Sequence, residues 1–94
     1  MTITVSAPVN QPPVANFTYT PPLPTTQDTI SFTDTSSDSD GIIISWLWSF
    51  GDGDSSAQQD PSHQYAEDGI YQINLTVWDD DGAVSYTHLT LPTN

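Results

Sequence analysis

The sequence predicts an all-β fold, a β-sandwich of about seven short strands. Hydrophobic residues alternate with polar ones along most of the chain, which is the pattern of strands that bury one face. Turn signals rich in Gly, Pro and Asp recur roughly every 8–12 residues, a spacing typical of sandwiches. No stretch of the chain shows the three-to-four-residue hydrophobic repeat of an amphipathic helix. The length of 94 residues suits one domain.

The first two strands are predicted on either side of a proline-rich segment. Residues 14–19 alternate, with Ala15, Phe17 and Tyr19 on one face. Residues 21–24 contain three prolines and cannot lie in a central strand. A second strand is predicted around Ile30, before the polar turn at 34–41.

The middle of the chain carries most of its aromatic residues. A third strand is predicted to direct one parity of side chains into the core: Ile44, Trp46, Trp48 and Phe50. A tight glycine-containing turn is expected at 51–54, and a short edge strand at 60–65.

The last two strands are predicted at 71–78 and 83–91, joined by an acidic turn at 79–82. In the first of them, the core-facing parity is hydrophobic at four positions in succession: Tyr71, Ile73, Leu75 and Val77. Trp78 has the opposite parity and is therefore predicted to point outward.

The domain boundaries follow from composition. Residues 1–13 are predicted to be a proline-rich linker, because each proline fixes φ and removes a backbone donor. Residues 14–91 form the predicted sandwich and 92–94 a short tail. The start of the chain lacks the pattern of a signal peptide, so we interpret it as one module of a longer protein.

The charge balance excludes several kinds of partner. The chain has 12 acidic residues, no Lys or Arg, a formal charge of −12 and a pI near 4.1. Without cations it is not expected to bind nucleic acid or an anionic membrane surface, and no apolar run is long enough for membrane insertion. The absence of cysteine excludes disulfides and thiolate chemistry. The expected ionic partners are cations.

Residues 48–53, Trp-Ser-Phe-Gly-Asp-Gly, resemble the W-x-F-G-D-G motif of PKD (polycystic kidney disease) domains. Four further segments match the motifs of that family in the same order: 13–17, 38–42, 61–65 and 69–79. The resemblance implies an immunoglobulin-like β-sandwich in an extracellular or cell-surface protein. It also implies a spacer or binding module and not an enzyme.

The end of the chain has a second resemblance. Residues 84–93 are similar to the translation of a transposase sequencing adapter. We therefore draw no functional conclusion from residues 84–94, although their alternation still predicts a strand.

The two acidic turns are a candidate calcium site. They present carboxylates on short loops, and calcium prefers six to eight hard oxygen ligands. Resemblance to the PKD-like domains of collagenases implies these ligands: Asn10, the backbone oxygen of Gln11, Asp38, Asp40 and Asp79. The expected dissociation constant is roughly 10⁻⁴ to 10⁻³ M. The alternative is that these residues only cap their own turns.

A second candidate site is an outward-facing apolar strip formed by Ile43, Leu47 and Trp78. Such a strip can bind a protein partner, and its aromatic ring can stack on a sugar. The alternative is that Trp78 packs only against its cross-strand neighbours.

No catalytic centre is predicted. His63 is expected to form a structural hydrogen bond to a neighbouring loop, and Asp52 to accept backbone N–H groups within its turn. The chain lacks the Gly-x-Ser-x-Gly pattern of a nucleophile elbow. Asn16 and Asn74 lie in N-x-[ST] sequons and are candidate glycosylation sites.

The sequence thus predicts a non-catalytic spacer or adhesion module of a larger secreted or cell-surface protein, stiffened by calcium. Its expected partners are neighbouring domains, other surface proteins or a polysaccharide. Two alternatives remain open at this point. One is a carbohydrate- or protein-binding module that uses the aromatic face, and the other is a self-assembling surface-layer or filament subunit.

Overall fold

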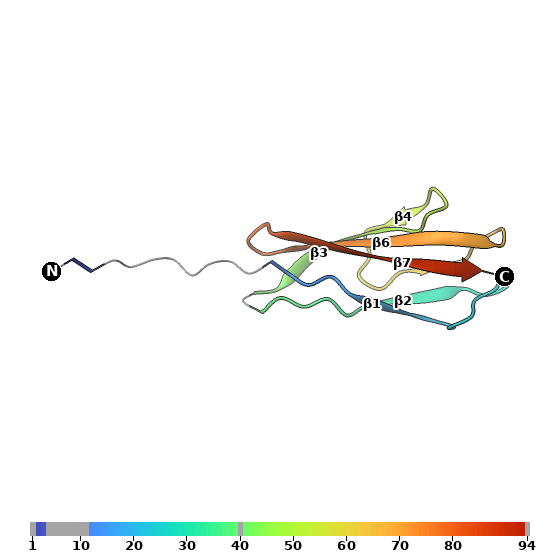
Figure 1. The fold of residues 1–94 in the computed structure, drawn as a ribbon, viewed down its shortest axis with the longest axis horizontal. Helices are drawn as coiled ribbons and strands as arrows, with labels where there is room; N and C mark the ends of the chain where they lie inside the picture. The colour runs from blue at the N-terminus through green and yellow to red at the C-terminus, as the bar shows by residue number, and fades with distance from the viewer. Residues whose placement is uncertain (1, 4–11, 40, 94) are drawn as a thin grey trace.

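The computed structural model describes residues 2–3, 12–39 and 41–93, and it confirms the all-β prediction. Two antiparallel sheets pack face to face (Figure 1). The smaller sheet has the order β1 (Phe17–Thr20), β2 (Ile30–Asp34), β5 (Ser62–His63). The larger has the order β4 (Ser55–Ser56), β3 (Ile43–Ser49), β6 (Gly69–Asp79), β7 (Val84–Thr93). No described segment forms a helix long and apolar enough to cross a membrane.

Aromatic rings from both sheets fill the space between the layers. Trp48 of β3 is 0% exposed and is the largest side chain in the core, as predicted. Phe17 of β1 meets it edge to face, with ring centroids 5.0 Å apart and planes at 73°. Phe32 of β2 lies 5.5 Å from the same ring. The core therefore joins the two sheets through contacts between aromatic rings, which bury large apolar areas.

A β-bulge near the start of β3 corrects one predicted orientation. The register pairs Ile43 with Asp79 and Ser45 with Trp78, so two steps along β3 oppose one step along β6. As a result Ile43, predicted to face outward, packs against the core. Ile44, predicted to face inward, is 53% exposed. Beyond the bulge, Trp46 and Trp48 keep the predicted parity.

One polar contact also links the two sheets. The indole Nε1 of Trp46 in β3 donates to Asp34 Oδ2 in β2, at 2.9 Å. The other oxygen of Asp34 accepts from the backbone N–H of Ser36, at 3.0 Å. Trp46 is half-buried, and its polar edge reaches this carboxylate.

The longest hairpin is formed by β6 and β7, which pair from Trp78↔Val84 to Gly69↔Thr93. The last strand therefore extends through Thr93, past the sandwich boundary predicted at residue 91. Thr93 is buried in this arrangement.

Candidate functional site

Three carboxylates converge at one end of the sandwich, and we call Asp38, Asp79 and Asp80 the acidic pole. Each offers one oxygen atom, and the three oxygens lie within 4.8 Å of one another. Backbone hydrogen bonding brings the two turns together: Asp80 N donates to Ile42 O at 3.0 Å, and Ile42 N donates to Asp80 Oδ1 at 3.3 Å. The turn before β3 and the β6–β7 turn consequently form one oxygen-rich surface.

Asp79 is the buried member of the acidic pole, with an exposed fraction of 0%. Its Oδ1 accepts from the backbone N–H of Ala83 at 2.7 Å and from that of Asp81 at 3.0 Å. Asp79 therefore caps its own turn, as the alternative interpretation expects. These two N–H groups offset part of the cost of burying the carboxylate.

Gly41 lies against the acidic pole. A Cβ atom added at this position would collide with Asp80 Oδ1 and would lie 3.4 Å from Asp38 Oδ2. The space that a side chain would fill is thus bordered by two carboxylates. Glycine is needed there for that close approach.

The structure brings together two of the predicted calcium ligands, Asp38 and Asp79. It adds Asp80, which the resemblance did not supply, although its place in the Asp79–Asp81 run could have indicated it. The remaining predicted ligands lie outside the described residues: Asn10, Gln11 and Asp40.

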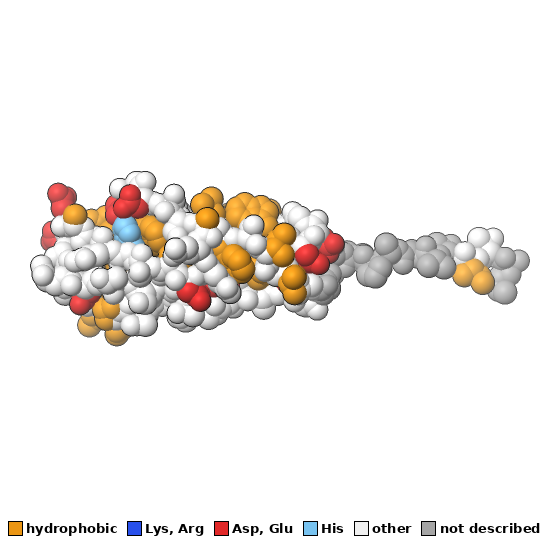
Figure 2. All heavy atoms as spheres, turned by 180° about the vertical axis from the view of Figure 1, so that it is seen from behind, with side chains coloured by type: hydrophobic (Ala, Val, Ile, Leu, Met, Phe, Trp, Pro, Cys, Tyr) orange, Lys and Arg blue, Asp and Glu red, His pale blue; other side chains and the backbone are white. Residues whose placement is uncertain are grey.

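An open apolar groove adjoins the acidic pole. Its apolar walls come from Ile44 and Leu47 of β3 and Trp78 of β6, and Asp79, Asp80 and Gly82 complete one end. Leu47 and Trp78 occupy the outward positions predicted for them, and Ile44 replaces Ile43 because of the bulge. Figure 2 shows that hydrophobic side chains reach the surface on one face, where acidic side chains and a histidine also lie but no Lys or Arg does.

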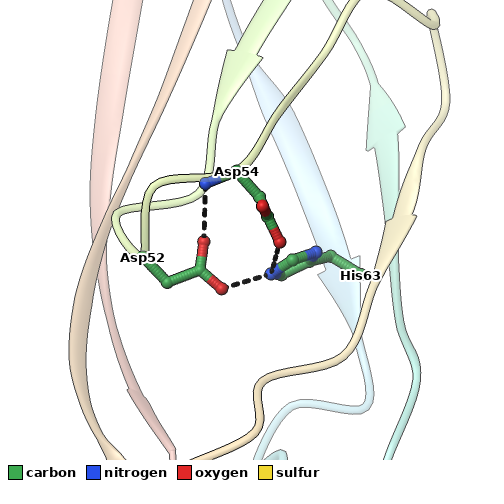
Figure 3. A group of neighbouring side chains, drawn as sticks. All are labelled: Asp52, Asp54 and His63. Carbon is green, nitrogen blue, oxygen red and sulfur yellow. Dashed lines mark hydrogen bonds and ion pairs between the residues drawn. The ribbon is translucent and has the colours of Figure 1, made fainter.

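A third cluster contains Asp52, Asp54 and His63 (Figure 3). His63 Nε2 lies 2.7 Å from Asp52 Oδ2 and 3.9 Å from Asp54 Oδ2. Asp52 Oδ1 accepts from the backbone N–H of Asp54 at 3.1 Å. These contacts confirm both predictions for this region: His63 bonds to a neighbouring loop, and Asp52 accepts a backbone N–H within its turn.

The pKa of Asp52 lies below its ordinary value. Burial by itself raises this pKa, but hydrogen bonds from His63 and the Asp54 backbone, together with the positive field of a charged imidazole, lower it by more. The carboxylate is therefore stabilised in its ionised form.

Two rings hold the imidazole of His63 in place. It stacks on Phe50, with centroids 4.4 Å apart and planes at 5°, and meets Tyr65 edge to face at 4.7 Å. Tyr65 is itself fixed, because its hydroxyl donates to Phe50 O at 2.6 Å. Burial raises the pKa of the Tyr65 hydroxyl well above its ordinary value, so this hydroxyl stays a donor.

The two sequon asparagines occupy different surroundings. Asn16 is exposed just before β1, and its side-chain oxygen accepts from the backbone N–H of Phe17 at 3.0 Å. Asn74 is half-buried in β6, opposite Ser49 on one side and His88 on the other.

Comparison with known proteins places this fold and its motifs among recognised domains. A family profile described as "PKD domain" matches residues 10–91. The PKD1 domain of Vibrio anguillarum Epp superposes with a TM-score of 0.83 at 37% identity, covering 92% of this chain and 98% of that one.

A second solved structure has a TM-score of 0.87 at 34% identity, covering 93% of this chain and 36% of the other. Its title concerns the promiscuous specificity of carbohydrate-binding modules from the β-sandwich superfamily. Among curated relatives, the pre-pro-metalloprotease PrtV of Vibrio cholerae is 52% identical over 48 residues, 51% of this chain and 5% of the relative. The chain spans only 5–7% of the length of the first curated relatives it matches, which are metalloproteases and collagenases.

Proposed function

The chain belongs to the PKD domain family, and from this premise we propose that it is a non-catalytic, extracellular spacer module of a larger protein, stiffened by calcium. The matched relatives are proteases and collagenases in which a segment of this kind forms a small part of the chain. A spacer role agrees with that arrangement. An extracellular location agrees with the calcium proposal, because extracellular modules bind calcium with millimolar to submillimolar dissociation constants.

A non-catalytic role is supported by the way the interior is used. Aromatic and aliphatic side chains from both sheets occupy it, so the space between the layers contributes packing and not a substrate cleft. The imidazole of His63 contacts Asp52, Phe50 and Tyr65, and these contacts hold the ring in place within the fold.

The convergence of Asp38, Asp79 and Asp80 is the observation that carries the calcium proposal. Ionised carboxylates this close together repel one another, and a divalent cation among their oxygens would relieve that repulsion. Carboxylate oxygens on short turns are the ligands that calcium prefers, and Gly41 allows two of these carboxylates to approach the backbone closely. Asn10, Gln11 and Asp40 would complete the ligand set and join the linker to the sandwich.

A thermal melt tests this site. We expect millimolar calcium to raise the melting temperature relative to EDTA, and magnesium at equal ionic strength to raise it less. Asp38→Asn keeps the side-chain shape, and it should remove the part of the rise in melting temperature that is specific to calcium. Asp68→Asn removes the same charge from an exposed position elsewhere and should leave it intact. Equal responses to both ions, or equal effects of both substitutions, would show that cations stabilise the domain only by general charge screening and not by binding at the acidic pole.

The apolar groove supports a second candidate function, binding of a polysaccharide. Its wall combines an aromatic ring, Trp78, with the exposed aliphatic side chains of Ile44 and Leu47. Sugar rings stack on such surfaces through their apolar faces. One similar solved structure has a title that concerns carbohydrate-binding modules, which agrees with this candidate.

Pull-down on insoluble polysaccharides tests the groove. Trp78→Ala should abolish retention if the groove binds sugar. Ile70→Ala removes an exposed hydrophobic side chain from the opposite end of the same strand and serves as the matched control. Equal retention of the two variants would exclude the groove as the binding surface.

A further inference from the structure

We propose that Asp52, Asp54 and His63 form a second cation site, separate from the acidic pole, that binds a divalent transition-metal ion such as zinc. The cluster differs from the acidic pole in its chemistry, because it adds an imidazole nitrogen to two carboxylate oxygens (Figure 3). Imidazole suits zinc and its neighbours in the first transition row, whereas calcium prefers oxygen alone.

The separations of the ligand atoms fit such an ion after a small adjustment. Zinc binds nitrogen and oxygen ligands at about 2.0–2.2 Å, so two neighbouring ligands of a tetrahedral ion lie about 3.4 Å apart. Here the distance from His63 Nε2 to Asp52 Oδ2 is 2.7 Å and that to Asp54 Oδ2 is 3.9 Å. The first contact must lengthen and the second shorten, each by well under 1 Å.

Two of the three ligands are already held in place. The ring of His63 is fixed between Phe50 and Tyr65, and pairing of its backbone with Ile30 fixes its strand. Asp52 is oriented by the bond that its Oδ1 accepts from Asp54 N. Ligands that are fixed in advance lose little conformational entropy on binding.

Asp54 is the ligand that must move, and its surroundings permit it. Its side chain is 70% exposed, against 22% for Asp52 and 11% for His63. The cluster is thus closed on the imidazole side and open on the Asp54 side, where water can complete the coordination of the ion.

The charge of the cluster also favours a divalent cation. Two carboxylates face one imidazole, and the chain has no Lys or Arg that could compete for them. On binding, the ion takes the place of the proton on Nε2, and the neutral ring keeps its proton on Nδ1.

The test is a titration of the untagged chain with zinc chloride in the presence of excess calcium, which occupies oxygen-only sites. We expect one equivalent of zinc to bind, and the NMR signals of the His63 ring to shift while those of His88 do not. Asp54→Asn should weaken zinc binding about tenfold or more, since even outer-shell changes cost that much at metal sites.

Two controls keep the result specific. Asp68→Asn removes the same charge from an exposed residue outside the cluster, and His88→Gln removes the other imidazole of the chain. Both should bind zinc as the parent chain does. Absence of zinc binding, unchanged binding by Asp54→Asn, or loss of binding in His88→Gln would each overturn the proposal. Because the side chain of Asp54 is mostly exposed, its substitution should not unfold the domain.

Discussion

At the scale of single residues, the aspartate carboxylates have different structural roles, which depend on their surroundings. Asp79 is buried and accepts two backbone N–H groups, Asp34 accepts an indole N–H across the two sheets, and Asp52 is paired with His63. The sequence predicted a turn role for Asp52 and a calcium-ligand role for Asp79, but it assigned no role to Asp34. The donors to Asp79 come from its own turn, whereas the partners of Asp34 and Asp52 are Trp46 and His63, more than ten residues away. Local spacing could therefore indicate the role of Asp79 but not these two long-range partners.

Asp52→Asn should lower the free energy of unfolding at neutral pH by about 1 kcal/mol, because it weakens the bonds from His63 and the Asp54 backbone. The pKa of Asp52 is lower in the folded state, so its contribution is complete above the unfolded pKa of about 3.9. That contribution disappears as the pH falls through the lower folded value. Urea denaturation of both chains from pH 7 to pH 2 measures it, and a difference that persists undiminished at pH 2 would contradict this assignment.

Gly51→Ala should destabilise the domain more than Gly53→Ala. Both glycines have positive φ, at 84° and 97°, and both substitutions therefore cost about 1–2 kcal/mol in backbone strain. A Cβ at Gly51 would also lie 2.7 Å from the backbone oxygen of Gln72, whereas one at Gly53 would meet nothing within 4 Å. Chemical denaturation measures the free energy of unfolding of both variants. Equal losses of stability would show that the backbone can shift away from β6 at no cost.

At the scale of elements, alternation predicted the strands well but could not predict the bulge in β3. The chain enters this strand through three identical residues, Ile42, Ile43 and Ile44. Hydrophobicity gives no reason to bury one of them in preference to the others. Pairing with β6 decides, because the bulge turns Ile43 inward and leaves Ile44 in the groove beside Trp78. The contribution of Ile44 to the candidate groove therefore could not be predicted from the sequence.

The contact between β2 and β3 through Trp46 and Asp34 should couple the two sheets energetically. Trp46→Phe keeps most of the apolar contact but removes the N–H donor, and we expect a loss of about 1–2 kcal/mol. In a double-mutant cycle with Asp34→Asn, the two losses should add to more than the loss of the double variant. Strict additivity, measured by urea denaturation, would show that the 2.9 Å contact contributes nothing to stability.

At the scale of the whole molecule, fold and family followed from the sequence, because alternation and five ordered motifs extend over nearly the full domain. The candidate sites followed only in part. Asp38 and Asp79 were predicted to meet, since both end up in turns at one end of the sandwich, and they do. Asp80 and the pairing of Asp54 with His63 depend on the exact path of two turns, which composition and spacing leave open.

We propose that calcium at the acidic pole ties the linker to the sandwich. Because the chain has no cysteine, spin labels can be attached at two positions of choice without removing native residues of that type. Ile3→Cys places one label before the linker residues Asn10 and Gln11, and Gln72→Cys places the other at an exposed position of β6. Pulsed electron–electron double resonance then measures the distribution of distances between them.

We predict that calcium narrows this distribution, that magnesium does not, and that Asp38→Asn abolishes the narrowing while Asp68→Asn preserves it. A distribution of the same width in EDTA and in saturating calcium would contradict the account, because the linker would then be independent of the acidic pole.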